Sequence, residues 1–206
     1  GGSFHGWQRQ KGIRTVQGTL EEALSRIANH QVETRAAGRT DSGVHAMGHV
    51  VHFDTMAERS DKAWTEGVNS WLSNDVAVRW VARPGPDFDA RFSAQSRTYR
   101  YLVFVDSVVN PFFESAALRE HRPLNTELMN ESAQHLVGEH DFSSFRAAHC
   151  QSKSPMRRVT SISVEEHQGF IQIEITANAY LYHMVRNIVG ALRLVGACQR
   201  PPEWLG

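Results

Sequence analysis

The feature that most constrains the fold of this chain is an order of helices and strands that recurs on either side of one break. The break is the run Arg83-Pro84-Gly85-Pro86, because proline and glycine interrupt regular structure. Before it the hydrophobic spacing predicts the order α-β-β-α-β, and after it β-α-β-β-α. We therefore predict two halves, residues 1–86 and 87–206.

The expected elements follow from apolar residues that recur at helical or strand spacing. In the first half they are a helix over 15–29, extended segments over 32–37 and 50–53, a helix over 63–72 and a strand over 76–81. In the second half they are a strand over 98–105, a helix over 125–136, a hairpin of 159–164 with 170–175, and a helix over 180–195. Between the first two extended segments, Gly38 to Gly43 has the composition of a loop.

One further strand would complete each half. A strand before the first half and another after the second turn each into β-α-β-β-α-β, the split βαβ or ferredoxin-like unit. The chain opens in a Gly1-Gly2-Ser3 turn that should follow a strand, and it stops at 201–206, where another helix can start. We therefore expect an α+β chain that is clipped at both ends. Loss of an inner strand would lower its stability or activity.

Composition excludes several classes of protein. No apolar run approaches the roughly 20 residues that span a bilayer, and no basic region precedes an apolar stretch as in a secretory signal. The only two cysteines, Cys150 and Cys198, form no C-x-x-C motif. This low cysteine content is typical of a protein in the reducing cytoplasm. The formal net charge is zero, but only three of the 22 basic residues are lysines. Arginine suits phosphate and base contacts, so charge alone favours neither presence nor absence of a nucleic-acid partner.

Five stretches carry the functional signal. They are Phe4-His5-Gly6-Trp7-Gln8-Arg9-Gln10, the segment Ala37-Gly38-Arg39-Thr40-Asp41-Ser42-Gly43-Val44-His45-Ala46, the pair Ala90-Arg91-Phe92-Ser93-Ala94 with Arg97-Thr98-Tyr99-Arg100-Tyr101, then His140-Asp141-Phe142-Ser143-Ser144-Phe145-Arg146, and His183-Met184-Val185-Arg186-Asn187-Ile188-Val189-Gly190. In content and order these resemble the TruA-type tRNA pseudouridine synthases. The resemblance covers nearly the whole chain.

The resemblance implies a fold and an activity. The expected fold is two ferredoxin-like halves that share a continuous, mostly antiparallel sheet, with helices packed on one face and an RNA cleft between the halves. The expected activity is the isomerisation of uridine to pseudouridine at positions 38, 39 and 40 of the tRNA anticodon stem-loop. The resemblance further implies a homodimer that works without a cofactor or a metal.

Asp41 takes the role of the catalytic carboxylate by this resemblance. The reaction breaks the bond between ribose C1′ and uracil N1, turns the base and joins C1′ to C5, with the carboxylate either attacking C1′ or removing a ribose proton. Burial favours the protonated form of a carboxyl group, so a neighbouring guanidinium is needed to keep it charged. Arg186 is the ion-pair partner that the resemblance implies. The apolar neighbours Val185, Ile188 and Val189 predict that this arginine is buried.

Other residues are assigned to RNA contacts. Tyr99 and Tyr101 lie on the same face of a predicted strand, and the register of Arg-x-Tyr-Arg-Tyr selects Tyr99 as the residue that stacks on the target base. A uridine inside an RNA stem must be turned out of the stack, and the resemblance implies that Arg39 assists this step. Candidate contacts to the RNA backbone are Arg9, Arg14, Arg91, Arg97, Arg146, Arg157 and Arg158.

Three alternative interpretations compete with this one. A metal site at His45, His49 and His52 is disfavoured, because residues 49 and 52 of a strand point to opposite faces. A family member that binds tRNA but has lost catalysis would fit the same motifs. A carboxylate-dependent glycosidase would need a second catalytic carboxylate, and the sequence assigns none.

Overall fold

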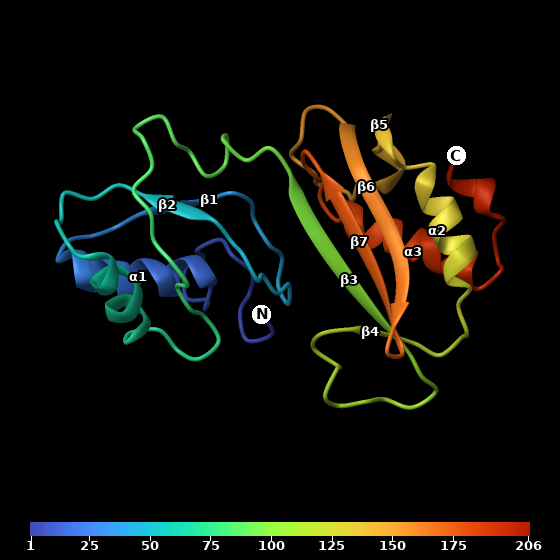
Figure 1. Ribbon diagram of the computed structural model, residues 1–206, viewed down its shortest axis with the longest axis horizontal. Coiled ribbons are helices and arrows are strands. Elements are labelled where there is room, and N and C mark those ends of the chain that lie inside the picture. Colours follow the sequence, from blue (N-terminus) through green and yellow to red (C-terminus); the bar gives the residue numbers. More distant parts are fainter. The chain divides into compact units, whose positions relative to one another are not determined.

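The computed structural model describes residues 1–206 and divides them into two compact units, Gly1–Ala94 (unit 1) and Gln95–Gly206 (unit 2). Unit 1 contains α1 (Val16–Ala28), β1 (Thr34–Ala36), β2 (Val51–Phe53) and the π-helical turn η1 (Ala63–Gly67). Unit 2 contains β3 (Arg97–Val105), β4 (Leu118–Glu120), α2 (Thr126–Gln134), β5 (Gly138–Asp141), η2 (Ser143–Phe145), β6 (Met156–His167), β7 (Phe170–Ala177), α3 (Met184–Gly196) and η3 (Pro202–Leu205). This α+β content confirms the predicted class (Figure 1). None of the helices has both the length and the apolar character that crossing a bilayer requires.

The helix α1 organises the core of unit 1. The Thr15 hydroxyl accepts a hydrogen bond from the N–H of Gly18 at the start of the helix, and Asn29 closes its end in the left-handed conformation. Its apolar stripe of Leu20, Ala23 and Leu24 is buried against a cluster that includes Trp7, Val32, Trp64 and Val68. The predicted helix over 15–29 is confirmed.

The strands β1 and β2 pair antiparallel with each other, Thr34 opposite Phe53 and Ala36 opposite Val51. Both correspond to predicted extended segments. The predicted strand over 76–81 is wrong, because this segment has no regular structure and joins no ladder. The amide side chain of Asn69 takes the place of a neighbouring strand: its Oδ1 accepts from the Val78 N–H at 2.7 Å, and its Nδ2 donates to the Val78 carbonyl at 2.8 Å.

Unit 2 is built on one five-stranded sheet of order β4-β3-β7-β6-β5. The pairs of β3 with β7, β7 with β6 and β6 with β5 are antiparallel, and only β3 with β4 is parallel. The predicted hairpin forms and is longer than expected. Its turn, Gln168-Gly169, has positive φ at both residues, as the tight hairpin turns that match strand twist require.

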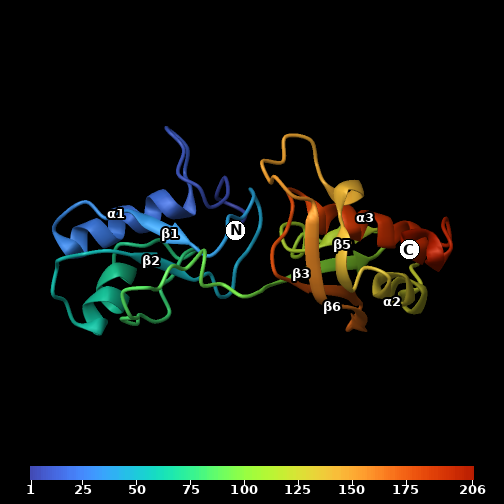
Figure 2. The same cartoon turned by 90° about the horizontal axis from the view of Figure 1, so that it is seen from above.

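The two helices of unit 2 cover the same face of this sheet (Figures 1 and 2). Along β7 the side chains of Ile171, Ile173 and Ile175 are buried, and the residues between them are only partly so. The buried row packs with Met129 of α2 and with Met184, Ile188 and Leu192 of α3 in one core. Each such side chain contributes about 1.5–3 kcal/mol when fully buried. Alternation in the strands and helical spacing in α2 and α3 thus fix which faces meet.

Two expectations about this architecture need correction. The strands do not form one continuous sheet, because the three-residue strands β1 and β2 form a ladder only with each other. The last helix begins at Met184 and not at residue 180. His183 has a left-handed conformation, and the Tyr182 N–H donates to Cys150 Sγ, so these residues are held outside the helix.

Candidate active site

The loop between β1 and β2 presents Asp41 on a tight turn. The Ala37 N–H donates to the Val50 carbonyl at 2.9 Å and closes the loop directly after the last strand pair. Within the loop, the Val44 N–H donates to the Asp41 carbonyl at 3.2 Å. Gly43 has a φ of +81°, a conformation that glycine adopts without steric cost. Asp41 is partly buried, so its position is set by the fold of the loop.

The N-terminal segment, residues 4–7, packs against this loop. The Trp7 N–H donates to the Thr40 carbonyl at 3.0 Å, and the Ser42 hydroxyl donates to the Phe4 carbonyl at 3.4 Å. Gly6 is buried between them with a φ of +83°. A Cβ at this position would lie 2.6 Å from the Thr40 carbonyl oxygen, closer than such atoms approach. Only glycine therefore allows the two backbones to meet here.

Trp7 and His49 form a second support for the loop. Their rings are stacked with centroids 4.6 Å apart and planes 13° from parallel. Burial lowers the pKa of the His49 imidazole, against the opposing effect of a hydrogen bond with the Gly38 backbone. His52 has a different packing role, with its Nδ1 accepting from the Ala90 N–H at 2.9 Å. No group of three His, Cys, Asp or Glu residues that could hold a metal comes together in the structure.

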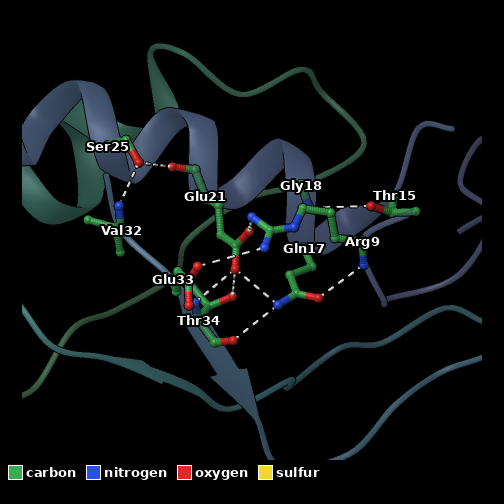
Figure 3. Close-up of polar contacts among 9 residues, drawn as sticks. All are labelled: Arg9, Thr15, Gln17, Gly18, Glu21, Ser25, Val32, Glu33 and Thr34. Carbon is green, nitrogen blue, oxygen red and sulfur yellow. Dashed lines mark hydrogen bonds and ion pairs between the residues drawn. The ribbon is translucent and has the colours of Figure 1, made fainter. Parts of the chain in front are cut away.

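A buried carboxylate ties the N-terminal segment to β1, the strand that leads into the Asp41 loop (Figure 3). Glu21 is 5% exposed. Its Oε1 accepts from the Thr34 N–H at 2.8 Å and the Thr34 hydroxyl at 3.0 Å. Its Oε2 accepts from Arg9 Nη1 at 2.9 Å. Gln17 completes the network: it accepts from the Arg9 N–H, and its amide donates to Glu21 and to the Thr34 carbonyl.

Tyr99 lies near the start of β3, opposite Ile175 of β7. Its ring meets the ring of Tyr180 edge to face, with centroids 4.9 Å apart and planes at 82°. The Tyr180 hydroxyl lies 2.7 Å from the Ile175 carbonyl oxygen and 3.0 Å from that of Arg97, and burial raises the pKa of this phenol. Tyr101 packs against the core of unit 2. The two tyrosines thus differ in setting, and Tyr180 orients Tyr99.

Arg186 lies in the first turn of α3 and is exposed, so the predicted burial is wrong. Ile188 and Val189 are buried in the core as expected. Asp41 and Arg39 belong to unit 1, whereas Tyr99 and Arg186 belong to unit 2. The predicted site therefore draws its residues from both units.

Comparison with known proteins decides the family. A family model described as "tRNA pseudouridine synthase" matches residues 1–93 and 132–206. The chain belongs to this family. The tRNA pseudouridine synthase A of Idiomarina loihiensis is 52% identical to this chain, in an alignment that covers all of this chain and 79% of the Idiomarina protein. Those of Tolumonas auensis (49%, 79% of its length) and Vibrio cholerae (50%, 78% of its length) also align with the whole chain.

Only some of the predicted site residues lie inside the stretches that the family model matches. Arg39, Asp41 and Arg186 lie inside them, as do the supporting residues Gly6 and Trp7. Tyr99 lies between the two stretches. Its assignment therefore depends on the Arg-x-Tyr-Arg-Tyr motif and on the whole-length similarity to the curated tRNA pseudouridine synthases.

The arginines assigned to RNA contacts divide into two groups in this synthase chain. Arg39 and Arg91 are exposed in unit 1. In unit 2, Arg146 Nη2 donates to the carbonyls of Cys150 and Ser152, both at 2.7 Å, and Arg157 Nη2 donates to the Ser152 hydroxyl at 2.6 Å. Burial lowers the pKa of Arg157. These two guanidinium groups thus hold the loop before β6, and Arg97 similarly donates to the Asn178 carbonyl at 2.8 Å.

Sequence reasoning missed the residues that support the site. The helix predicted over 180–195 includes Tyr180, so the sequence gives this residue no separate role. Gly6 and Trp7 were noted only as part of a motif. A signal was present for Gly6, because glycine within a motif often marks a positive φ or a close backbone approach.

Proposed function

We propose that this chain is a tRNA pseudouridine synthase that isomerises uridines 38, 39 and 40 of the anticodon stem-loop, with Asp41 as its catalytic carboxylate. The observation that carries the proposal is the family match over residues 1–93, which includes the Asp41 loop and the segment that supports it. The C1′–N1 bond breaks, the C1′–C5 bond forms, C5 loses its proton and N1 gains one, so substrate and product have the same composition. The reaction involves no net oxidation and no net hydrolysis.

The other site residues have distinct roles in this proposal. Tyr99, oriented by Tyr180, stacks on the everted uracil. Arg186 forms an ion pair with the Asp41 carboxylate, and its exposure on α3 leaves the guanidinium accessible from outside unit 2. Arg39, two residues before Asp41, fills the vacated stack, since eversion of a base costs a few kcal/mol. Arg9, Arg91, Arg97, Arg146 and Arg157 line the RNA path. Four of them, Arg9, Arg97, Arg146 and Arg157, also hold their own segments in place.

We further propose that the chain works as a homodimer in the cytoplasm, where tRNA is its partner. The arginine-rich basic set supports an RNA partner through planar guanidinium groups that bind phosphate and stack on bases.

The position of the product tests the proposed substrate. The protein is incubated with a tRNA transcript that has uridine at 38, 39 and 40, and pseudouridine is located by carbodiimide labelling and primer extension. We expect label at these positions and none when they are changed to cytidine. Pseudouridine confined to other positions would contradict the assignment of the anticodon stem-loop. Bound tRNA without any pseudouridine would indicate a binding module, and free uracil would indicate a glycosidase.

A further inference from the structure

A short turn in unit 1 is fixed by more hydrogen bonds than its length requires. The Asp89 Oδ1 accepts from the N–H groups of Arg91 at 2.8 Å and Phe92 at 3.0 Å. The Ser93 N–H donates to the Asp89 carbonyl at 2.8 Å, and the Ser93 hydroxyl accepts from the Asp89 N–H at 3.1 Å. The backbone under residues 91 and 92 is therefore held in one conformation.

The same turn is anchored to the β1–β2 sheet that carries the Asp41 loop. Ala90 is buried, and its N–H donates to His52 Nδ1 of β2 at 2.9 Å. On the other side of that ring, His52 Nε2 lies 3.8 Å from Asp89 Oδ2. Arg35, which is paired with His52 across the two strands, reaches the same oxygen at 3.8 Å. The turn is thus a fixed extension of the sheet.

This fixed turn presents an aromatic ring to solvent. Phe92 is 79% exposed, and the guanidinium carbon of the exposed Arg91 lies 5.3 Å from the centre of its ring. A phenylalanine in this position contributes little to folding, because burial of its ring is what stabilises a fold. Arg91 lies at the ring, and Arg35 reaches the Asp89 carboxylate of the same turn. The turn therefore presents a flat apolar surface beside a guanidinium group.

We propose that Phe92 and Arg91 form a stacking platform for an unpaired base of the tRNA substrate. An unpaired nucleotide offers a flat base for the ring and a phosphate for the guanidinium, and aromatic side chains beside basic ones are how single-stranded nucleic acid is bound. A protein partner fits less well. A stable protein interface buries about 800 Å² on each side, whereas the exposed ring of Phe92 is set among charged groups. The inference rests on the proposed function and adds a binding residue, Phe92, to it.

Binding of an anticodon stem-loop RNA to the full chain tests the platform. We compare Phe92→Leu, which keeps an apolar side chain but removes the aromatic face, with Phe92→Trp, which keeps that face. Phe112→Leu is the matched control, because this phenylalanine is 89% exposed in unit 2. We expect Phe92→Leu to weaken binding about tenfold, in the range for loss of one stacked base. Phe92→Trp and Phe112→Leu should bind as the wild type does.

Salt dependence separates the ring from the charge. Phe92→Leu should leave the slope of log affinity against log salt unchanged, whereas Arg91→Gln should reduce it by about one, as for a lost phosphate contact. Equal affinity of Phe92→Leu and the wild type would overturn the platform. So would a change of sedimentation in Phe92→Leu with unchanged RNA affinity, which would assign the ring to a protein interface. If the wild type forms pseudouridine in tRNA, such a result refutes the platform alone, and absence of pseudouridine refutes the proposed function itself.

Discussion

At the scale of single residues, the Asp41 loop depends on Gly6. This glycine allows the N-terminal segment to lie directly against Thr40, and the Trp7 N–H then holds the Thr40 carbonyl. The motif around residue 6 and the motif around residue 41 are far apart in sequence, yet they form one structural unit. The sequence predicted both motifs, but not their contact, because a contact between backbones leaves no hydrophobic pattern.

Gly6→Ala tests this contact, and Gly12→Ala is its matched control. Both glycines have positive φ, +83° and +74°, but a Cβ at residue 12 would meet nothing within 4 Å. The strained backbone should cost each variant roughly 1–3 kcal/mol of stability. Only Gly6→Ala should also lose turnover, because its Cβ displaces Thr40 and with it the Asp41 loop. Urea unfolding and rates of pseudouridine formation measure the two effects. A similar loss of turnover in both variants would contradict the proposed support.

The tyrosines show where residue-level prediction succeeded and where it stopped. The alternation of β3 correctly put Tyr99 and Tyr101 on one face but could not distinguish them. The structure distinguishes them through Tyr180, which contacts the ring of Tyr99. That residue comes from the segment between β7 and α3, and no local pattern reports such a contact between distant segments.

At the scale of elements, the long periodic segments were predicted, and two short strands of unit 2, β4 and β5, were not. The helices α1 and α2 and the strands β3, β6 and β7 follow from spacing. The strand β5 has the sequence Gly138-Glu139-His140-Asp141, which contains no apolar residue and lies at a sheet edge. The strand β4 has three residues and pairs in parallel with β3. Pairing with a neighbour, and not hydrophobic pattern, makes these two segments strands.

A buried carboxylate joins the short strand β4 to α3. Glu120 is 0% exposed, and it accepts two hydrogen bonds from Arg122, both at 2.9 Å. Its Oε2 also accepts from Arg193 Nε of α3 at 2.9 Å. The two guanidinium groups, with Arg122 the stronger, hold the pKa of the Glu120 carboxyl well below its usual range. The ion pair therefore stabilises the folded state where the carboxyl is ionised.

Glu120→Gln should lower the free energy of unfolding by about 2 kcal/mol at pH 7. That is less than the 3–5 kcal/mol for a fully buried pair, because the arginines are partly exposed. Because the folded pKa is depressed, the stabilisation is present above the unfolded value of about 4.3 and is lost as pH falls below it. The difference in free energy of unfolding between variant and wild type should therefore shrink between about pH 5 and pH 3, where the carboxyl group of the unfolded chain takes up its proton. Urea unfolding at each pH measures it.

Glu139→Gln provides the control for this experiment. Glu139 pairs with Arg158, and both side chains are more than half exposed. Exposed pairs contribute at most about 1 kcal/mol, so the change should be small at either pH. A loss in Glu120→Gln that is independent of pH, or one matched by Glu139→Gln, would show that the buried ion pair is not the source of the stability.

At the scale of the whole molecule, the chain consists of two units whose boundary differs from the sequence pattern. The Pro-Gly-Pro run at 84–86, where the sequence predicts the boundary, lies inside unit 1, because residues 87–94 also belong to that unit. The turn at Asp89 is the reason, because His52 and the burial of Ala90 bind this segment to the β1–β2 sheet. Proline and glycine indicate where regular structure stops. They do not indicate which hydrophobic core the following residues join.

The chain covers about four-fifths of the length of the curated synthases to which it is similar, 79% in two of them. Within that span the proposed reaction depends above all on the Asp41 carboxylate of unit 1. We propose that it acts at the ribose of the target uridine, while Tyr99 stacks on the base and Arg186 pairs with the carboxylate. Asp41 lies in the loop between β1 and β2, inside the residues 1–93 that the family model matches.

Release of tritium from tRNA labelled at C5 of uridine tests this claim most directly. Asp41→Asn is compared with the wild type and with Asp61→Asn, which changes an exposed aspartate of the same unit that pairs with Arg83. We predict that the wild type and Asp61→Asn release tritium at the same rate. Asp41→Asn should retain its affinity for tRNA and release none. Release by Asp41→Asn at the wild-type rate would contradict the central claim.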